Sequence, residues 1–243
     1  MNGLCNSYIA LDVETTGLRV KEDRIIEIAA IKVIEGREVE SFNTLIDPHM
    51  KLSEYTKDIT GIEEKQLLDK PSIEDVMPKF LEFIEEFPLL GHRILFDYSF
   101  IKKAAVNLGV EFNKEGIDTL ELSRLCLPKE QSKVLKEACK FMNIDVKDWH
   151  RALPDARASH SLYQALKLKF ADLLGDKKIK KDLKFKIKKE QTASRTQKEH
   201  LQNILNCHKI TLEIDIDTLS RNQISRIIDK IKFNKAYIDG ERK

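Results

Sequence analysis

Close to its start the chain has a near-continuous apolar run that two acidic residues interrupt. The run, YIALDVETTGL at residues 8–18, is typical of a strand that is buried on both faces of a sheet. Because side chains alternate along a strand, Asp12 and Glu14 are expected to point to the same face. Neighbouring carboxylates at a buried strand end repel each other unless a cation binds between them. For this pair alone, an acidic strand end that faces water is the plainer interpretation.

The hydrophobic spacing farther along the chain predicts a mixed α/β sheet. Two more strands are expected at 24–36 and 37–47, and Gly36 in the short turn between them favours an antiparallel start to the sheet. A further short strand is expected at 88–91, among helices, which indicates a mixed sheet. The expected helices span residues 53–58, 63–68, 73–87, 98–108, 119–126, 132–142 and 154–174.

Two of these helices begin close to an aspartate that heads an apolar stripe. Apolar residues follow Asp97 and Asp155 at helical spacing, so both carboxylates are expected to face the core. A carboxylate in such a place must be protonated, paired, capping its helix or bound to a metal. Capping is the plainer interpretation for either residue alone. Four acids on three buried elements instead favour a cation site with oxygen ligands, which suits Mg²⁺ or Mn²⁺ and not zinc.

A histidine precedes the last of these acids by five residues. His150 lies in WHRALPDA, on the loop that is expected before Pro154. Beside a water that a cation polarises, a histidine can accept a proton near neutral pH. A surface histidine that packs on Trp149 is the alternative.

Composition narrows the class of protein. The chain has 243 residues, of which 34% are charged and 42% hydrophobic, which suits one substantial domain and a small one. It contains no apolar run of about 18 residues and no secretory signal pattern, so we expect no membrane partner. The four cysteines show no C-x-x-C spacing, so we expect reduced side chains and a cytoplasmic location.

The net charge of +2 conceals two oppositely charged parts. Residues 1–174 have a net charge of −6, and residues 175–243 have a net charge of +8. The segment 177–189 contains eight lysines and one aspartate, which suits either a solvated linker or a tether for nucleic acid. We therefore expect a domain at 1–174, a basic linker at 175–194 and a small helix–extended–helix module at 195–243.

Three motifs occur in an order and spacing that resemble DEDDh-type 3′–5′ exonucleases. They are DVETTGL at 12–18, GHRILFDYSFI at 91–101 and HRALPDA at 150–156. Over about residues 7–170 the chain is similar to the proofreading epsilon subunit of bacterial DNA polymerase III and to the exonuclease domain of PolC-type polymerases. The resemblance implies a ribonuclease H-like fold with a mixed five-stranded sheet flanked by helices. The basic C-terminal segment would then be a small helical appendage.

The resemblance also implies roles for individual residues. Two divalent ions, Mg²⁺ or Mn²⁺, would be held by Asp12, Glu14, Asp97 and Asp155. His150 would be the general base of phosphodiester hydrolysis. The 3′-terminal nucleotide would contact Thr15, Thr16, Gly17, Leu18 and Phe96. Arg93 departs from the family, which usually has asparagine there, and we expect Arg93 to contact a substrate phosphate or to form a salt bridge with a neighbour.

Three functions stay open at this point. The first is hydrolysis of single-stranded DNA from its 3′ end to 5′-mononucleotides, either in proofreading with a DNA polymerase or in repair. The second is the same chemistry on RNA, because the group that would read a 2′-hydroxyl cannot be identified in the sequence. The third, of another class, is a nucleic-acid-binding module on the same fold without catalysis.

Overall fold

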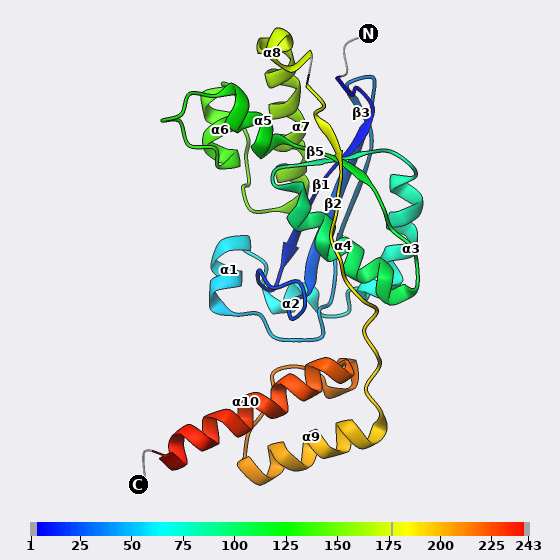
Figure 1. Cartoon of the computed structure of the whole chain (residues 1–243), viewed down its shortest axis with the longest axis vertical. Helices are drawn as coiled ribbons and strands as arrows, with labels where there is room; N and C mark the ends of the chain where they lie inside the picture. The colour runs from blue at the N-terminus through cyan, green and yellow to red at the C-terminus, as the bar shows by residue number, and fades with distance from the viewer. Residues whose placement is uncertain (1–3, 176, 241–243) are drawn as a thin grey trace. The chain divides into compact units, whose positions relative to one another are not determined.

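The computed structural model describes residues 4–175 and 177–240, which form two compact units (Figure 1). The larger unit comprises the chain up to Pro48 together with Leu52–Ile187. The smaller unit comprises His49–Lys51 and the chain from Lys188 onward. The outermost residues of the expected domain and module, 1–3 and 241–243, lie outside the described residues, as does residue 176 of the expected linker.

A six-stranded mixed sheet lies at the centre of the larger unit, with strand order β3-β2-β1-β4-β5-β6. Its strands are β1 (Tyr8–Thr15), β2 (Ile25–Ile34), β3 (Arg37–Leu45), β4 (Leu89–Gly91), β5 (Glu115–Asp118) and β6 (Lys180–Asp182). The first three strands pair antiparallel, whereas β4 pairs parallel with both β1 and β5. The predicted mixed α/β sheet is confirmed, with six strands in place of five.

The sixth strand corrects the expected bounds of the linker. β6 lies inside residues 175–194 and pairs antiparallel with β5. The strand was not predicted because its lysines suggest a solvated segment. In the structure Lys180 and Lys181 form ion pairs with glutamates, while Ile179 and Leu183 pack into hydrophobic clusters. The larger unit therefore continues into the first half of the expected linker.

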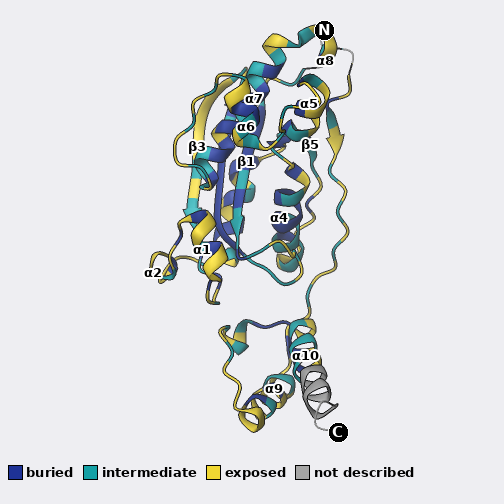
Figure 2. Cartoon of the chain, turned by 90° about the vertical axis from the view of Figure 1, so that its left-hand side faces the viewer, coloured by how far each residue is buried: buried dark blue, intermediate teal, exposed yellow. Residues whose placement is uncertain are grey.

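Helices cover both faces of the sheet. They are α1 (Glu54–Thr60), α2 (Glu64–Leu67), α3 (Ile73–Ile84), α4 (Ile94–Leu108), α5 (Thr119–Cys126), α6 (Leu135–Phe141), α7 (Ala152–Lys169) and α8 (Ala171–Gly175). One hydrophobic cluster joins Leu11 and Val13 to α3 and α4, and a second joins Tyr8 and Ala10 to α5, α6 and α7. Figure 2 shows the buried residues concentrated along the central strands and these helices. Even-numbered residues of β1 therefore point to the α7 face.

Two helices begin earlier than the hydrophobic spacing predicts. α4 begins at Ile94 and not at 98, after Arg93 turns the chain with a left-handed backbone at φ 72°. α7 begins at Ala152, so Pro154 is its third residue. Proline is tolerated there because the first N–H groups of a helix have no partner within the helix.

The smaller unit has a hydrophobic cluster of its own. It contains α9 (Arg195–His208), the 3-10 helix η1 (Ile216–Thr218) and α10 (Arg221–Gly240). Leu201 and Leu205 of α9 pack with Leu219 and Ile224 in this cluster. In the extended piece between the helices, Ile214 forms an isolated bridge with Met50. Nowhere in the described ranges is a helix both long and apolar enough to cross a membrane.

Candidate active site

The carboxylates of Asp12, Glu14 and Asp155 meet at the end of β1. Each offers an oxygen atom, and these atoms all lie within 4.8 Å of one another. β1 directs Asp12 and Glu14 to the face that α7 covers, and Asp155 lies in the first turn of α7. The structure thus brings together three of the four acids that the sequence predicts.

Asp97, the fourth acid, approaches the same strand end from α4 on the other face of the sheet. It is buried, and its Oδ1 accepts a hydrogen bond from the backbone N–H of Val13 at 3.1 Å. Asp97 is the fourth residue of α4 and does not cap it, because the N-cap is Arg93. Its charge is close enough to raise the pKa of Asp12, so it belongs to the same electrostatic cluster.

Burial raises the pKa values of all four acids, and repulsion by nearby carboxylates raises them further. Desolvation is the largest cause in each case. It raises the pKa of Glu14 to about 8, that of Asp97 to about 8 and that of Asp155 to about 6. The pKa of Asp12 lies well above its usual value because of desolvation and the charges of Asp97 and Glu14. These carboxylates can be ionised together only when a cation compensates them.

A divalent cation fits this arrangement. Oδ2 of Asp155 accepts a hydrogen bond from the backbone N–H of His150 at 3.2 Å, whereas Oδ1 is buried and has no hydrogen-bond partner among the described residues. Such an orphaned oxygen is rare in folded proteins and needs an explanation. An all-oxygen donor set of neighbouring carboxylates suits a hard divalent cation.

His150 lies on the loop directly before α7. Its backbone is left-handed, with φ 63°, and its side chain is exposed. A positive φ is uncommon outside glycine, and here the N–H of the same residue bonds to Asp155. Trp149, by contrast, packs against the hydrophobic cluster of the α7 face. The His150 imidazole is therefore free to meet a ligand beside the acids.

A fifth acid, which the sequence reasoning missed, lies beside the other four. Glu27 of β2 is the cross-strand partner of Glu14 and is 1% exposed. Arg151 donates to both of its oxygens, from Nε to Oε2 at 3.0 Å and from Nη2 to Oε1 at 2.8 Å. The backbone N–H of Ala152 donates to Oε2 at 3.2 Å. This pairing fixes the start of α7 against β2. A single acid within the apolar run IIEIAAI was the signal in the sequence.

The end of β1 and the loop after it contain four of the residues expected to bind the 3′-terminal nucleotide, at positions 15–18. The hydroxyl of Thr15 donates to the carbonyl of Gly17 at 2.6 Å, and the hydroxyl of Thr16 accepts from the N–H of Arg24 at 3.0 Å. A Cβ atom at Gly17 would lie 2.7 Å from Oδ2 of Asp23. Glycine therefore allows the Asp23 carboxylate to close this loop.

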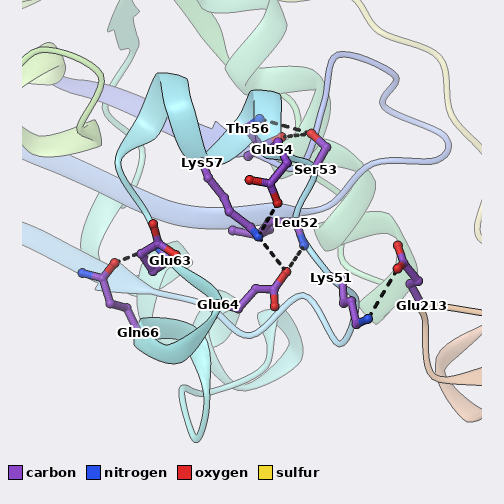
Figure 3. Close-up of polar contacts among 10 residues, drawn as sticks. All are labelled: Lys51, Leu52, Ser53, Glu54, Thr56, Lys57, Glu63, Glu64, Gln66 and Glu213. Atoms are coloured by element: carbon purple, nitrogen blue, oxygen red, sulfur yellow. Dashed lines mark hydrogen bonds and ion pairs between the residues drawn. The ribbon is translucent and has the colours of Figure 1, made fainter.

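Helices α1 and α2 support the same loop. The hydroxyl of Thr56 in α1 donates to the carbonyl of Thr16 at 3.0 Å. Lys57 joins the two helices through ion pairs with Glu54 at 2.8 Å and Glu64 at 3.4 Å (Figure 3). The position of the loop therefore depends on a polar network that local sequence patterns did not predict.

The other predicted contact residues differ in exposure. Leu18 is 75% exposed, whereas Phe96 is half-buried and packs on Phe100 with ring centroids 5.1 Å apart. Arg93 is exposed, and within the described part of the chain its guanidinium forms no ion pair. Of the two alternatives for Arg93, the salt bridge to a neighbour is therefore not observed.

Comparisons with known proteins agree with this arrangement. The exonuclease family model RNase_T matches residues 9–163. The DNA polymerase III PolC-type of Caldanaerobacter subterraneus subsp. tengcongensis is 38% identical over 156 residues, which cover 64% of this chain and 11% of that protein. The PolC-type polymerase of Thermotoga petrophila is 37% identical over 172 residues, which cover 69% of this chain and 12% of that protein. The chain thus spans little more than a tenth of these relatives.

Solved structures with the same fold are also exonucleases. A structure of Exonuclease X in complex with 5′-overhanging duplex DNA has a TM-score of 0.57 and 26% identity, covering 70% of this chain and 98% of that one. E. coli Exonuclease I in complex with a dA16 oligonucleotide has a TM-score of 0.61 and 18% identity, covering 70% and 42%. The predicted fold of the larger unit is confirmed by these likenesses.

Proposed function

The chain belongs to the exonuclease family whose model spans residues 9–163, and we propose that it is a metal-dependent 3′–5′ exonuclease that acts on DNA. One observation carries the proposal. Carboxylate oxygens of Asp12, Glu14 and Asp155 lie within 4.8 Å of one another, and Oδ1 of Asp155 is buried without a partner. The DEDDh pattern of the motifs supports the 3′–5′ polarity. The names of the PolC-type relatives and the DNA in the Exonuclease X structure support DNA as the substrate.

Each residue of the site has a part in the proposed hydrolysis. Asp12, Glu14, Asp97 and Asp155 would hold two divalent cations, Mg²⁺ or Mn²⁺, which when bound polarise the scissile phosphate. His150 would accept the proton of the attacking water. The bond between phosphorus and the 3′-oxygen of the penultimate nucleotide then breaks, and the terminal nucleotide leaves as a 5′-monophosphate.

The loop after β1 would hold the nucleotide that leaves. Its exposed Leu18 and the half-buried ring of Phe96 offer apolar surface to a sugar and base. The hydroxyls of Thr15 and Thr16 are engaged in the loop's own hydrogen bonds, so they would act by shaping the backbone. Because the relatives are named as DNA polymerases, a polymerase is the partner we propose for a proofreading activity. Stand-alone repair is the alternative.

A digestion series tests polarity, metal and substrate together. DNA and RNA oligonucleotides of one sequence, labelled at either end, are digested with Mg²⁺, with Mn²⁺ and with chelator. We expect 5′-labelled DNA to shorten stepwise and 3′-labelled DNA to release labelled mononucleotide at once, both only with metal. Asp12→Asn should be inactive, whereas Asp172→Asn, which removes an exposed carboxylate on α8, should keep activity.

Other outcomes would reassign the function. Faster digestion of RNA than of DNA would make the chain an exoribonuclease. Retention of DNA without cleavage in either metal would make it a binding module on an exonuclease fold.

A further inference from the structure

A cavity of about 510 Å³ opens beside the acids. Asp12 and Asp155 form part of its wall. In the described structure, residues 15–18 and Phe96, which would hold the 3′-terminal nucleotide, do not line it. The cavity is therefore a second space that touches the same carboxylates.

Two arginines, Arg93 and Arg124, line this cavity. Both are exposed, and as far as the chain is described neither guanidinium forms an ion pair or a hydrogen bond. Arg151, directly before α7, and Arg157 of α7 are, in contrast, each paired with a glutamate. A guanidinium that lines a cavity and forms no ion pair or hydrogen bond is available to a ligand, and its planar fork suits phosphate oxygens.

One carboxylate fixes the backbone of both arginines. Oδ1 of Asp118 accepts the N–H of Arg93 and the N–H of Leu120, each at 2.9 Å. The first bond holds Arg93 in its left-handed conformation, and the second caps α5, which contains Arg124. Because the two backbones are fixed before a ligand arrives, the ordering cost of binding is reduced.

His92 and Lys133 shape the wall next to the arginines. Nε2 of His92 lies 2.7 Å from the carbonyl of Lys133 and must donate, so Nδ1 accepts from the hydroxyl of Thr119 at 2.9 Å. Desolvation lowers the pKa of His92, which agrees with a neutral ring. The ammonium of Lys133 donates to the carbonyls of Pro128 and Lys129 at 2.5 and 3.1 Å. The ammonium of Lys133 is thus bound within its own loop, whereas the two guanidinium groups form no such hydrogen bonds.

The rest of the wall is apolar and comes from Leu120, Val134 and Leu135. The cavity volume falls within the roughly 300–1,000 Å³ that is usual for ligand pockets. Cations next to apolar surface match a ligand that joins a phosphate to a sugar and base. The carboxylates of Asp12 and Asp155 in the wall match the place where a scissile phosphate would meet its cations.

We propose that this cavity binds the penultimate nucleotide of the substrate strand, with Arg93 and Arg124 holding the phosphate on its 5′ side. The inference rests on the proposed function, which places the 3′-terminal nucleotide at residues 15–18. A strand whose scissile phosphate lies at the acids must continue away from its terminal nucleotide. The cavity touches those acids and offers cations to the next phosphate.

The test compares two DNA dinucleotides that differ only in that phosphate. One has a 5′-phosphate and the other ends in a 5′-hydroxyl. Wild type should cleave the phosphorylated dinucleotide with a kcat/KM about tenfold higher or more, as hydrogen bonds to a charged group imply. Arg93→Gln and Arg124→Gln should each move this ratio towards one. Arg37→Gln removes an exposed arginine of β3 outside the cavity, and it should keep the wild-type ratio.

Two further measurements separate the outcomes. Thermal midpoints of both arginine variants should stay close to that of wild type, because neither guanidinium has an ion pair or a hydrogen bond to lose. An unchanged ratio in both variants would overturn the inference and leave exonuclease activity, and hence the proposed function, standing. If the variants instead weakened inhibition by nucleoside 5′-monophosphate at an unchanged ratio, the cavity would be a product site and the inference would be wrong. No cleavage of either dinucleotide or of longer DNA would overturn the proposed function and the inference together.

Discussion

Helix α7 is joined to the sheet by two glutamate–arginine pairs that differ in burial and in surroundings. Near its start, Arg151 pairs with Glu27 of β2, whose side chain is 1% exposed. Farther along, Arg157 pairs with Glu38 of the edge strand β3, whose side chain is 32% exposed. The inner pair lies beside the clustered acids of the candidate site and the outer pair faces water. Concentrated, poorly solvated charge at the start of the helix supports the proposed site there, because a buried ion pair is weak evidence for stability and perturbed charges are typical of functional sites.

The inner pair also takes part in the electrostatics of the site. Glu27 raises the pKa values of Asp12, Glu14 and Asp155, and Arg151 lowers that of Glu14. Arg151 thus compensates part of the negative charge of Glu27 and Glu14. The remainder has to be compensated by protons or by bound cations.

Asp155→Asn should have the largest effect, and it should change activity and stability in opposite directions. Loss of an acid that would hold the cations should lower the rate of digestion by on the order of 10³-fold or more. Loss of one charge relieves repulsion, so the thermal midpoint in chelator should rise by a few degrees. Digestion assays and calorimetry measure the two effects, with Asp172→Asn as control. Wild-type turnover of the Asp155 variant would contradict the proposal that the start of α7, unlike its later part, takes part in the reaction.

Arg151→Gln and Arg157→Gln test the two pairs directly. Removal of Arg151 leaves Glu27 buried without its charge partner, so we expect a loss of about 2–3 kcal/mol in the free energy of unfolding, less than for a fully buried pair because Arg151 is 37% exposed. Arg157→Gln should cost less than about 1 kcal/mol. Denaturant unfolding measures both. Glu27→Gln should be milder than Arg151→Gln, since it leaves no buried charge. Equal losses at the two arginines would contradict the comparison.

Without added cations, stability should fall as the pH rises from about 4.5 to about 8. The pKa of Glu14 is about 8 in the folded state against an ordinary 4.5, and that of Asp155 is about 6 against 3.8. A raised folded-state pKa gives stabilisation that is complete below the ordinary pKa and is lost as the pH rises through the folded-state pKa. Thermal midpoints in chelator should therefore be a few degrees lower at pH 8 than at pH 5, and Mg²⁺ or Mn²⁺ should reverse most of this.

Two glutamate variants serve as a matched pair for this pH dependence. Glu14→Gln removes one of the titrating groups and should flatten the curve. Glu38→Gln, in the outer pair, should keep the wild-type slope. A thermal midpoint that rises between pH 5 and pH 8 in chelator would show that the acids are not held in the unfavourable state inferred from their burial.

The sequence predicted the acids better than it predicted what holds them. Alternation along any strand was enough to place Asp12 and Glu14 on one face. Helical spacing put Asp155 on a core-facing stripe, but which face α7 covers is a property of the whole sheet. Glu27 was missed because its partner Arg151 lies 124 residues away, and no local pattern links them.

The difference between local patterns and contacts of distant residues also explains the errors in the predicted fold. β6 has three residues and is rich in lysine, so neither apolar alternation nor length revealed it. Ile179 and Leu183, which flank it, pack into hydrophobic clusters because β5 offers an edge for the strand to pair with. Asp97 was correctly placed on an inward-facing stripe, but its bond to the backbone of Val13 joins a helix and a strand that are far apart in sequence.

Removal of residues 188–243 should have the smallest effect on the chemistry, because the acids and His150 all lie in the unit that ends at Ile187. The kcat/KM for a trinucleotide should stay within about twofold of wild type, whereas affinity for a 30-mer should weaken and depend less on salt if the smaller unit binds phosphates. Deletion of 177–243 is the comparison, since it also removes β6 and should lower stability. Affinity and salt dependence that stay unchanged after the shorter deletion would exclude a nucleic-acid role for the smaller unit. A large loss of kcat/KM on the trinucleotide would show that the proposed site also depends on residues of the smaller unit.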